Sequence, residues 1–163
     1  MATAVEVAEL LWPKLIRERG ATFVAFLRPI AQRAFESYPN DLVGTELFVN
    51  HLHVLDWFEN SAKSTRAPYW RRTHPDFARA CRLAEVVGEA WAAKLGSEFP
   101  DKDFAVLVTR DDNPIVHFYE IRGPKDRWCD SLKNAPGSLI VIHSRSGRRT
   151  GSIRPPRASK KRA

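Results

Sequence analysis

The sequence predicts an α+β fold in which about four N-terminal helices pack on a small three-stranded antiparallel β-meander, followed by a disordered basic C-terminal tail. Apolar residues recur with a helical period through the first part of the chain, and the period changes to two after Pro100. From Ser144 onward almost nothing is large and apolar, so this segment cannot offset the entropy lost on ordering. We therefore expect one globular domain over residues 1–143 and a tail over residues 144–163.

The first predicted helix runs from about Ala4 to Arg19. Its inward-facing positions would be Val5, Ala8, Leu11, Leu15 and Trp12, with Gly20 as its stop. Pro13 lies inside this pattern and should kink the helix or delay its start.

The next segment is open to two interpretations. Its apolar residues from Phe23 to Tyr38 follow a helical period, but Pro29 interrupts the hydrogen-bond ladder of such a helix. Residues 21–27 are therefore either part of a helix, which we favour, or a short strand before a helix that begins at Pro29.

A third helix is predicted from about Thr45 to Glu59, after a turn over residues 40–45. A helical projection places His51 within its apolar arc and His53 on the opposite side. On such a helix the two histidines point apart and cannot bind one metal ion together.

The fourth helix has the clearest pattern. Residues 73–76 match a capping box, with Thr73 at the N-cap and Asp76 three residues later. Gly96 is the expected C-terminal stop. The buried stripe is predicted to consist of Phe77, Cys81, Ala84, Gly88, Trp91 and Leu95.

Two strands are predicted at residues 104–109 and 115–121, separated by the turn-forming residues 110–114. Because the first strand is apolar on both faces, we expect it in the middle of the sheet. A third run, residues 139–142, can add to this hairpin.

The residues suggest neither a catalytic centre nor a cofactor site. Cys81 and Cys129 lack the spacing of a zinc site or a disulfide framework, and the five histidines are scattered. There is no glycine-rich phosphate loop or other catalytic motif. We expect no metal and no cofactor, and we favour a protein that is not an enzyme. The alternative, a small enzyme, would use His51 or His117 in a pocket between helices and sheet.

Positive charge is concentrated at the C-terminus. The whole chain carries +7, whereas residues 1–143 carry −1, because eight basic and no acidic residues follow Ser144. A basic tail can bind phosphate backbones, and a loop that combines arginines with aromatic residues can bind unpaired bases or protein partners. The candidate binding residues are Arg66, Tyr69, Trp70, Arg71, Arg72, Arg148, Arg149, Lys160, Lys161 and Arg162.

The sequence therefore favours a non-enzymatic binding or regulatory protein whose partner is another protein. Nucleic acid, held by the tail and the loop over residues 66–72, is the alternative partner. Two unpaired cysteines suit a reducing compartment. An acidic N-terminal segment and short apolar runs favour neither a signal peptide nor a membrane partner. We expect a cytoplasmic protein.

Overall fold

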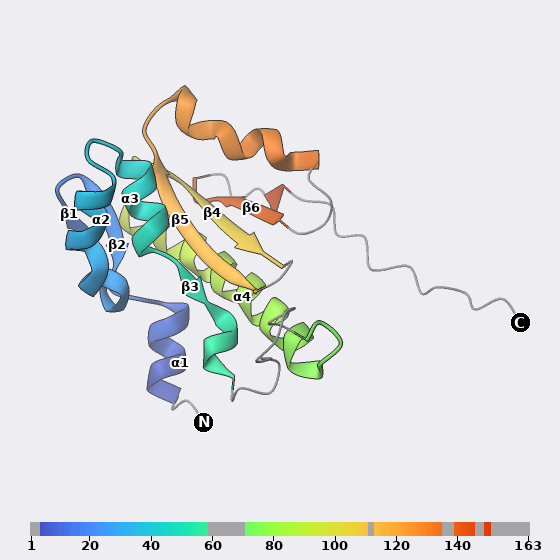
Figure 1. The fold of residues 1–163 in the computed structure, drawn as a ribbon. Helices are drawn as coiled ribbons and strands as arrows, with labels where there is room; N and C mark the ends of the chain where they lie inside the picture. Colours follow the sequence, from blue (N-terminus) through green and yellow to red (C-terminus); the bar gives the residue numbers. More distant parts are fainter. Residues whose placement is uncertain (1–3, 59–70, 111–112, 135–138, 146–148, 151–163) are drawn as a thin grey trace, which may run out of the picture.

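The computed structural model describes residues 4–58, 71–110, 113–134, 139–145 and 149–150, and has the expected mixture of helices and antiparallel sheets (Figure 1). The helices are α1 (Ala4–Leu11), η1 (Ala25–Ile30), α2 (Ala31–Ser37), α3 (Leu42–Val49), η2 (Val54–Trp57), α4 (Pro75–Glu98) and η3 (Pro124–Asn134), where η marks a 3-10 helix. The strands are β1 (Leu15–Glu18), β2 (Ala21–Val24), β3 (Leu52–His53), β4 (Asp103–Thr109), β5 (Ile115–Ile121), β6 (Leu139–His143) and β7 (Arg149–Thr150). None of the helices in these ranges has both the length and the hydrophobicity needed to cross a bilayer.

The main sheet has five antiparallel strands in the order β3-β5-β4-β6-β7, and β1 and β2 form a separate two-stranded sheet. The predicted β4–β5 hairpin and the central position of β4 are confirmed. The predicted three-stranded meander is wrong, because β6 pairs with β4 instead of β5. In that register Val106 lies opposite both Phe118 and Ile142. A strand that is apolar on both faces belongs in the interior of a sheet, where both of its faces are covered. β4 has this position, with β5 along one edge and β6 along the other.

Helix α4 covers one face of the main sheet (Figure 1). Its predicted buried stripe is confirmed, and Trp91 lies against Phe118 of β5. A Cβ atom at Gly88 would lie 2.5 Å from Val108, so glycine permits this close approach of helix and sheet.

Both predicted ends of α4 are shifted. The N-cap is His74, whose Nδ1 accepts a hydrogen bond from the Asp76 backbone N–H, because Pro75 suits the first helical position. The helix passes Gly96 and ends at Glu98. At Gly96 a Cβ would lie 2.7 Å from the Ser144 carbonyl oxygen, so this glycine serves packing and not termination.

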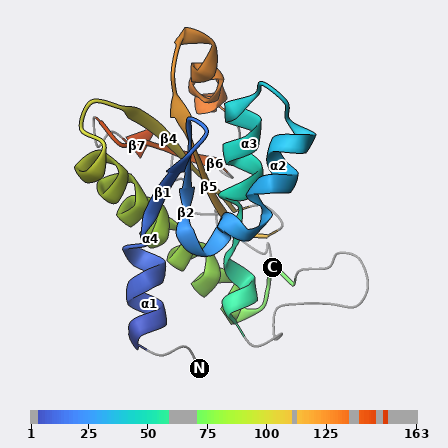
Figure 2. The ribbon, with the colours of Figure 1, turned by 90° about the vertical axis from the view of Figure 1, so that its left-hand side faces the viewer.

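The other face of the main sheet is covered by α3 and η3. Val43 and Leu47 of α3 and Cys129 of η3 pack there against a second core, which contains Leu107 and Tyr119. Figure 2 shows the β1–β2 hairpin between α4 on one side and the pair α2 and α3 on the other.

The predicted first helix over residues 4–19 is wrong beyond Leu11. Pro13 ends the helical pattern, and the chain then forms the β1–β2 hairpin. Arg19 and Gly20 both have positive φ, as a two-residue hairpin turn requires, so Gly20 is a turn residue and not a helix stop. Val5 and Trp12, expected inside, are 66% and 52% exposed.

In the following segment the favoured helix is wrong for residues 21–24, where the alternative, a strand, is found. Residues 21–24 form strand β2, and the helical residues begin at Ala25 with the short η1, which contains Pro29. The predicted helix over residues 45–59 is also too long, because α3 ends at Val49 and β3 and η2 follow. Asp41, expected in a turn, is the N-cap of α3 and accepts a hydrogen bond from the Gly44 N–H.

Within the predicted tail, the Ser144 backbone N–H donates to the Phe104 carbonyl, and β7 pairs with β6. The predicted tail therefore adds an edge strand to the sheet. Residues 146–148 and 151–163 lie outside the described residues, and the expectation of disorder there stays a prediction.

Candidate functional site

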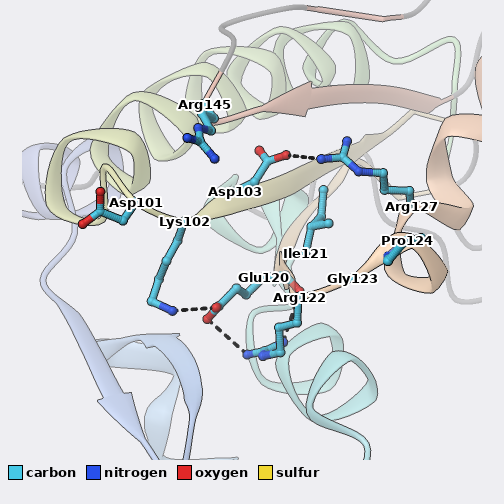
Figure 3. Close-up of a pocket in the computed structure, with 10 residues that line it drawn as sticks. All are labelled: Asp101, Lys102, Asp103, Glu120, Ile121, Arg122, Gly123, Pro124, Arg127 and Arg145. Atoms are coloured by element: carbon cyan, nitrogen blue, oxygen red, sulfur yellow. Dashed lines mark hydrogen bonds and ion pairs between the residues drawn. The ribbon is translucent and has the colours of Figure 1, made fainter.

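A charged hollow lies at one end of the main sheet, where β4 begins and where β5 and β6 end (Figure 3). Its volume is about 520 Å³. Four cationic and three acidic side chains line it together with three uncharged residues. They are Lys102, Arg122, Arg127 and Arg145; Asp101, Asp103 and Glu120; and Ile121, Gly123 and Pro124.

Glu120 is the central anion on one side of the hollow. Its side chain is only 7% exposed, and its carboxylate forms ion pairs with three cationic side chains. Lys102 Nζ lies 2.7 Å from one oxygen, while Arg17 and Arg122 lie 3.0 and 3.4 Å from the other. Charge-assisted hydrogen bonds to one buried carboxylate hold the three cations in fixed positions.

Arg122 extends from this group toward a fully buried carboxylate, that of Glu46 on α3. The two side chains form a bidentate pair, with Arg122 nitrogens 2.6 and 2.9 Å from the two oxygens of Glu46. Burial raises the pKa of Glu46, and the hydrogen bonds and charge of Arg122 oppose that shift. Burial is the largest single influence on the pKa of Arg122 and lowers it, but the hydrogen bonds to Glu46 and the negative charges of Glu46, Glu120 and Asp126 together raise it more, so the net shift is upward.

Glu46 of α3 and Asn50, the C-cap of that helix, join the two sheets. The Glu46 carboxylate accepts the backbone N–H groups of Thr22 in β2 and Glu120 in β5, both at 2.8 Å. The Asn50 amide accepts from the Val24 N–H and donates to the carbonyls of Thr22 and Phe118. Backbone groups that would otherwise pair strand to strand are thus satisfied by side chains. This arrangement, which we call the ionic seam, comprises Glu46, Asn50 and Arg122.

The opposite side of the hollow is less completely matched. Asp103 forms one ion pair, 2.8 Å long, with Arg127 of η3, and its other oxygen is buried without a hydrogen-bond partner. Arg145 is exposed and has no hydrogen bond or ion pair within the described part of the chain. In Figure 3, Arg127 and Arg145 extend toward Asp103 from opposite sides, and the dashed line joins only Arg127.

The side chains of the hollow are of the kinds that bind charged groups. Asp103 and Glu120 are both engaged in ion pairs, and the residues that line the hollow include no serine, threonine, cysteine or histidine. Arginine and lysine, in contrast, are the usual partners of carboxylates and phosphates.

A second group of ionisable residues lies on the face of the main sheet that α3 and η3 cover. His51, His53 and His117 form this histidine cluster, with ring centroids 4.6 Å apart for the first two and 5.3 Å apart for His51 and His117. The prediction that His51 and His53 point apart is wrong, because the chain is extended after Val49 and side chains two apart in a strand share a face. Across the described ranges, no group of three or more His, Cys, Asp or Glu side chains is arranged to hold a metal ion.

Most of the binding residues suggested by the sequence are not tested by the structure. Arg66, Tyr69, Trp70, Arg148, Lys160, Lys161 and Arg162 lie outside the described residues. Arg71 and Arg72 are exposed just before α4, and Arg149 is part of β7. None of these three lines the hollow.

The sequence interpretation missed the residues of the hollow. It assigned no role to Arg122, although Arg122 makes the most buried ion pair described above. The available signal was the placement of charges at strand ends, with Asp101, Lys102 and Asp103 before or at the start of β4 and Glu120 and Arg122 at the end of β5. Antiparallel neighbours bring such ends together. Comparisons of this chain with protein families, with curated proteins and with solved structures found no match.

Proposed function

We propose that this chain is a non-enzymatic binding protein that recognises an acidic segment of another protein at the charged hollow. The observation that supports this most is the uneven matching of charge around the hollow. Four cationic side chains line it, and Arg145 at its edge has no partner within the described residues. A carboxylate that enters the hollow would find this arginine available, with Lys102 and Arg127 already held in place by their ion pairs.

The character of the walls favours a segment of a protein over a small molecule. Small-molecule sites are mainly lined by apolar and aromatic side chains, with a few polar groups for orientation. Here seven of the ten lining residues are charged, and Ile121 and Pro124 are the larger apolar ones. Such walls suit the charged rim of a protein interface.

The charge of the folded part favours a protein over nucleic acid. Residues 1–143 carry −1, whereas nucleic-acid-binding domains generally carry a basic face of their own. The cations of the hollow are gathered in one concave place. Side chains of a flexible acidic segment can enter such a place more easily than the phosphates of a duplex.

The test uses a fluorescein-labelled peptide of ten glutamates as the probe and fluorescence anisotropy as the readout. Arg145→Glu is compared with Arg33→Glu, which makes the same charge change at an exposed arginine of α2 outside the hollow. Loss of one charge-assisted hydrogen bond corresponds to about 1.5–3 kcal/mol, so we expect the affinity to fall by about tenfold or more. We expect Arg33→Glu to change it less than about twofold.

The C-terminal residues are basic and identical in both variants, so the comparison between them isolates the hollow. Equal weakening by the two substitutions would contradict the proposal, because it would mean that the peptide responds only to net charge. A single-stranded DNA oligonucleotide that binds more tightly than the peptide, and loses affinity on Arg145→Glu, would assign the hollow to nucleic acid instead.

A further inference from the structure

The outer edge of β5 is closed at its beginning by a very short strand. β3 pairs with β5 over two residues, Leu52 with Val116 and His53 with Ile115. One more backbone hydrogen bond follows, 2.9 Å long, from the Val54 N–H to the Pro114 carbonyl. Because few backbone hydrogen bonds hold β3, side chains across this seam contribute to keeping it closed. We call it the histidine seam.

The three imidazoles of the histidine cluster lie across this seam. His51 and His53 come from the β3 side, and His117 comes from β5, directly after the two paired residues. His51 stands edge-on to His117, with ring planes at 82°. The side chain of Asn113, in the turn before β5, contacts Nδ1 of His53 and so fixes that ring against the sheet.

The surroundings of His51 and His117 favour the neutral form of both rings. Burial, followed by the charges of His51 and His53, lowers the pKa of His117 to about 4. Burial, followed by His53, also lowers the pKa of His51. Three neighbouring imidazoles a few ångströms apart cannot all be charged without strong mutual repulsion.

Among the described residues, no carboxylate contributes to the pKa shift of His51 or of His117. On the elements that pack around the seam, Asp56 of η2 is exposed, and Glu46 of α3 is bound by Arg122. Arg110, at the end of β4, is paired with Glu85 of α4. The charges that act on His51 and His117 are those of the histidine cluster itself.

We propose that the histidine cluster is an acid-operated switch: with neutral rings β3 stays on β5, and proton uptake from solvent releases β3 and η2 from the sheet edge. Release would uncover Leu52, Val54 and Leu55, which are buried in the closed form. The switch is independent of the proposed function of the hollow, since it uses other residues at another part of β5.

The expected size of the effect follows from proton linkage. A histidine that titrates near 6.5 when exposed and near 4 when the seam is closed makes opening about 20-fold more favourable at pH 5 than at pH 7. His117 alone gives this factor, and His51 adds to it in the same direction.

Amide hydrogen exchange of the full chain tests the switch. The Val54 amide reports on the histidine seam, and the Val106 amide in the middle of β4 reports on opening of the whole sheet. After correction for intrinsic exchange rates, we expect protection of Val54 to fall about 20-fold between pH 7 and pH 5 and that of Val106 to fall clearly less. Unchanged protection of Val54, or an equal fall at both amides, would overturn the proposal.

Two variants identify the responsible groups. His117→Gln and, separately, His51→Gln remove a titrating ring, and each should reduce the pH dependence at Val54. Where a variant does not fold, NMR titration of the His117 ring in the wild-type chain decides. We expect its midpoint well below 6.5, with Val54 losing protection over the same pH range. An ordinary midpoint with constant protection of Val54 would overturn the switch.

Discussion

The two sides of the charged hollow differ in how completely their charges are matched. On one side the ionic seam buries Glu46, satisfies both of its oxygens with Arg122 and two backbone N–H groups, and joins β2 to β5. On the other side Arg145 is exposed and has no partner within the described residues. A buried charge with every hydrogen bond filled holds a fold together, whereas an exposed unmatched charge remains available to a ligand.

The outer edge of β5 shows a related contrast. Its later half is closed by the charged groups of the ionic seam, and its first half is closed by β3 and the uncharged rings of the histidine seam. Near neutral pH both arrangements provide hydrogen-bond partners for the backbone at the outer edge of β5. Only the histidine seam depends on side chains of a type that gains charge in mild acid. The two seams should therefore respond differently to substitution and to pH.

The largest effect is expected at the ionic seam. Glu46→Gln replaces the closer anionic partner of Arg122 by a neutral amide, leaving Glu120 at 3.4 Å, and puts a donor in place of one of the two oxygens that accept backbone N–H groups. We expect it to lower the free energy of unfolding by about 3–5 kcal/mol, measured by urea denaturation. Glu36→Gln, at an exposed position of α2, should change it by less than about 0.5 kcal/mol. Similar effects of the two substitutions would remove the distinction between structural and available charges.

Asn50→Ala separates the hydrogen bonds of the ionic seam from its charge. The substitution leaves the Val24 N–H and the carbonyls of Thr22 and Phe118 without their partner. We expect a loss of about 3 kcal/mol, with the same denaturation readout. Backbone groups of β2 and β5 that pair directly in the variant would make the loss much smaller, and a crystal structure of the variant would reveal that rearrangement.

The pH dependence of stability comes next. Because the pKa of His117 is lowered to about 4 in the folded protein, the unfolded chain binds its proton first as the pH falls. Above about pH 6.5 the neutral ring costs no stability. As the pH falls from there, the free energy of unfolding decreases, and the loss due to His117 reaches about 3 kcal/mol at pH 4. The difference in free energy of unfolding between wild type and His117→Gln, measured over this pH range, separates the contribution of His117 from that of the carboxylates. A constant difference would show that the ring is not held neutral by the fold.

Arg145→Glu should have the smallest effect on stability. The arginine is exposed and forms no ion pair within the described part of the chain, so we expect a change below about 0.5 kcal/mol. The same variant is the one that should weaken binding of the glutamate peptide most. A strongly destabilised Arg145→Glu protein would place this residue among the structural charges.

The predictable parts of the fold are those governed by local pattern. The periodic patterns of α4, β4 and β5 are strong enough that all three elements are found close to where they are expected. Pro13 and the short β1–β2 hairpin show the limit, because Leu15 and Ile16 fit a helical stripe as well as a strand. Pairing decided between the two, with Ile16 opposite Phe23.

The hollow and the histidine seam could not be found in this way. Arg122 and Glu46 are 76 residues apart, and their pairing depends on how α3 lies against β5. Whether His53 points the same way as His51 depends on whether residues 51–53 are helical or extended. The apolar pattern of residues 45–59 favoured one long helix and so gave the wrong answer. Long-range pairing and one local misassignment together hid both groups of residues.

The central claim is that the charged hollow binds acidic protein segments, and an NMR titration of the full chain with the ten-glutamate peptide tests it most directly. We predict that the backbone amides of Lys102, Ile121, Gly123 and Arg145 shift with one common saturation curve, and that Arg145→Glu abolishes these shifts. Shifts confined to residues after 150, with the amides around the hollow unmoved, would contradict the claim and assign the attraction to the basic C-terminal residues alone.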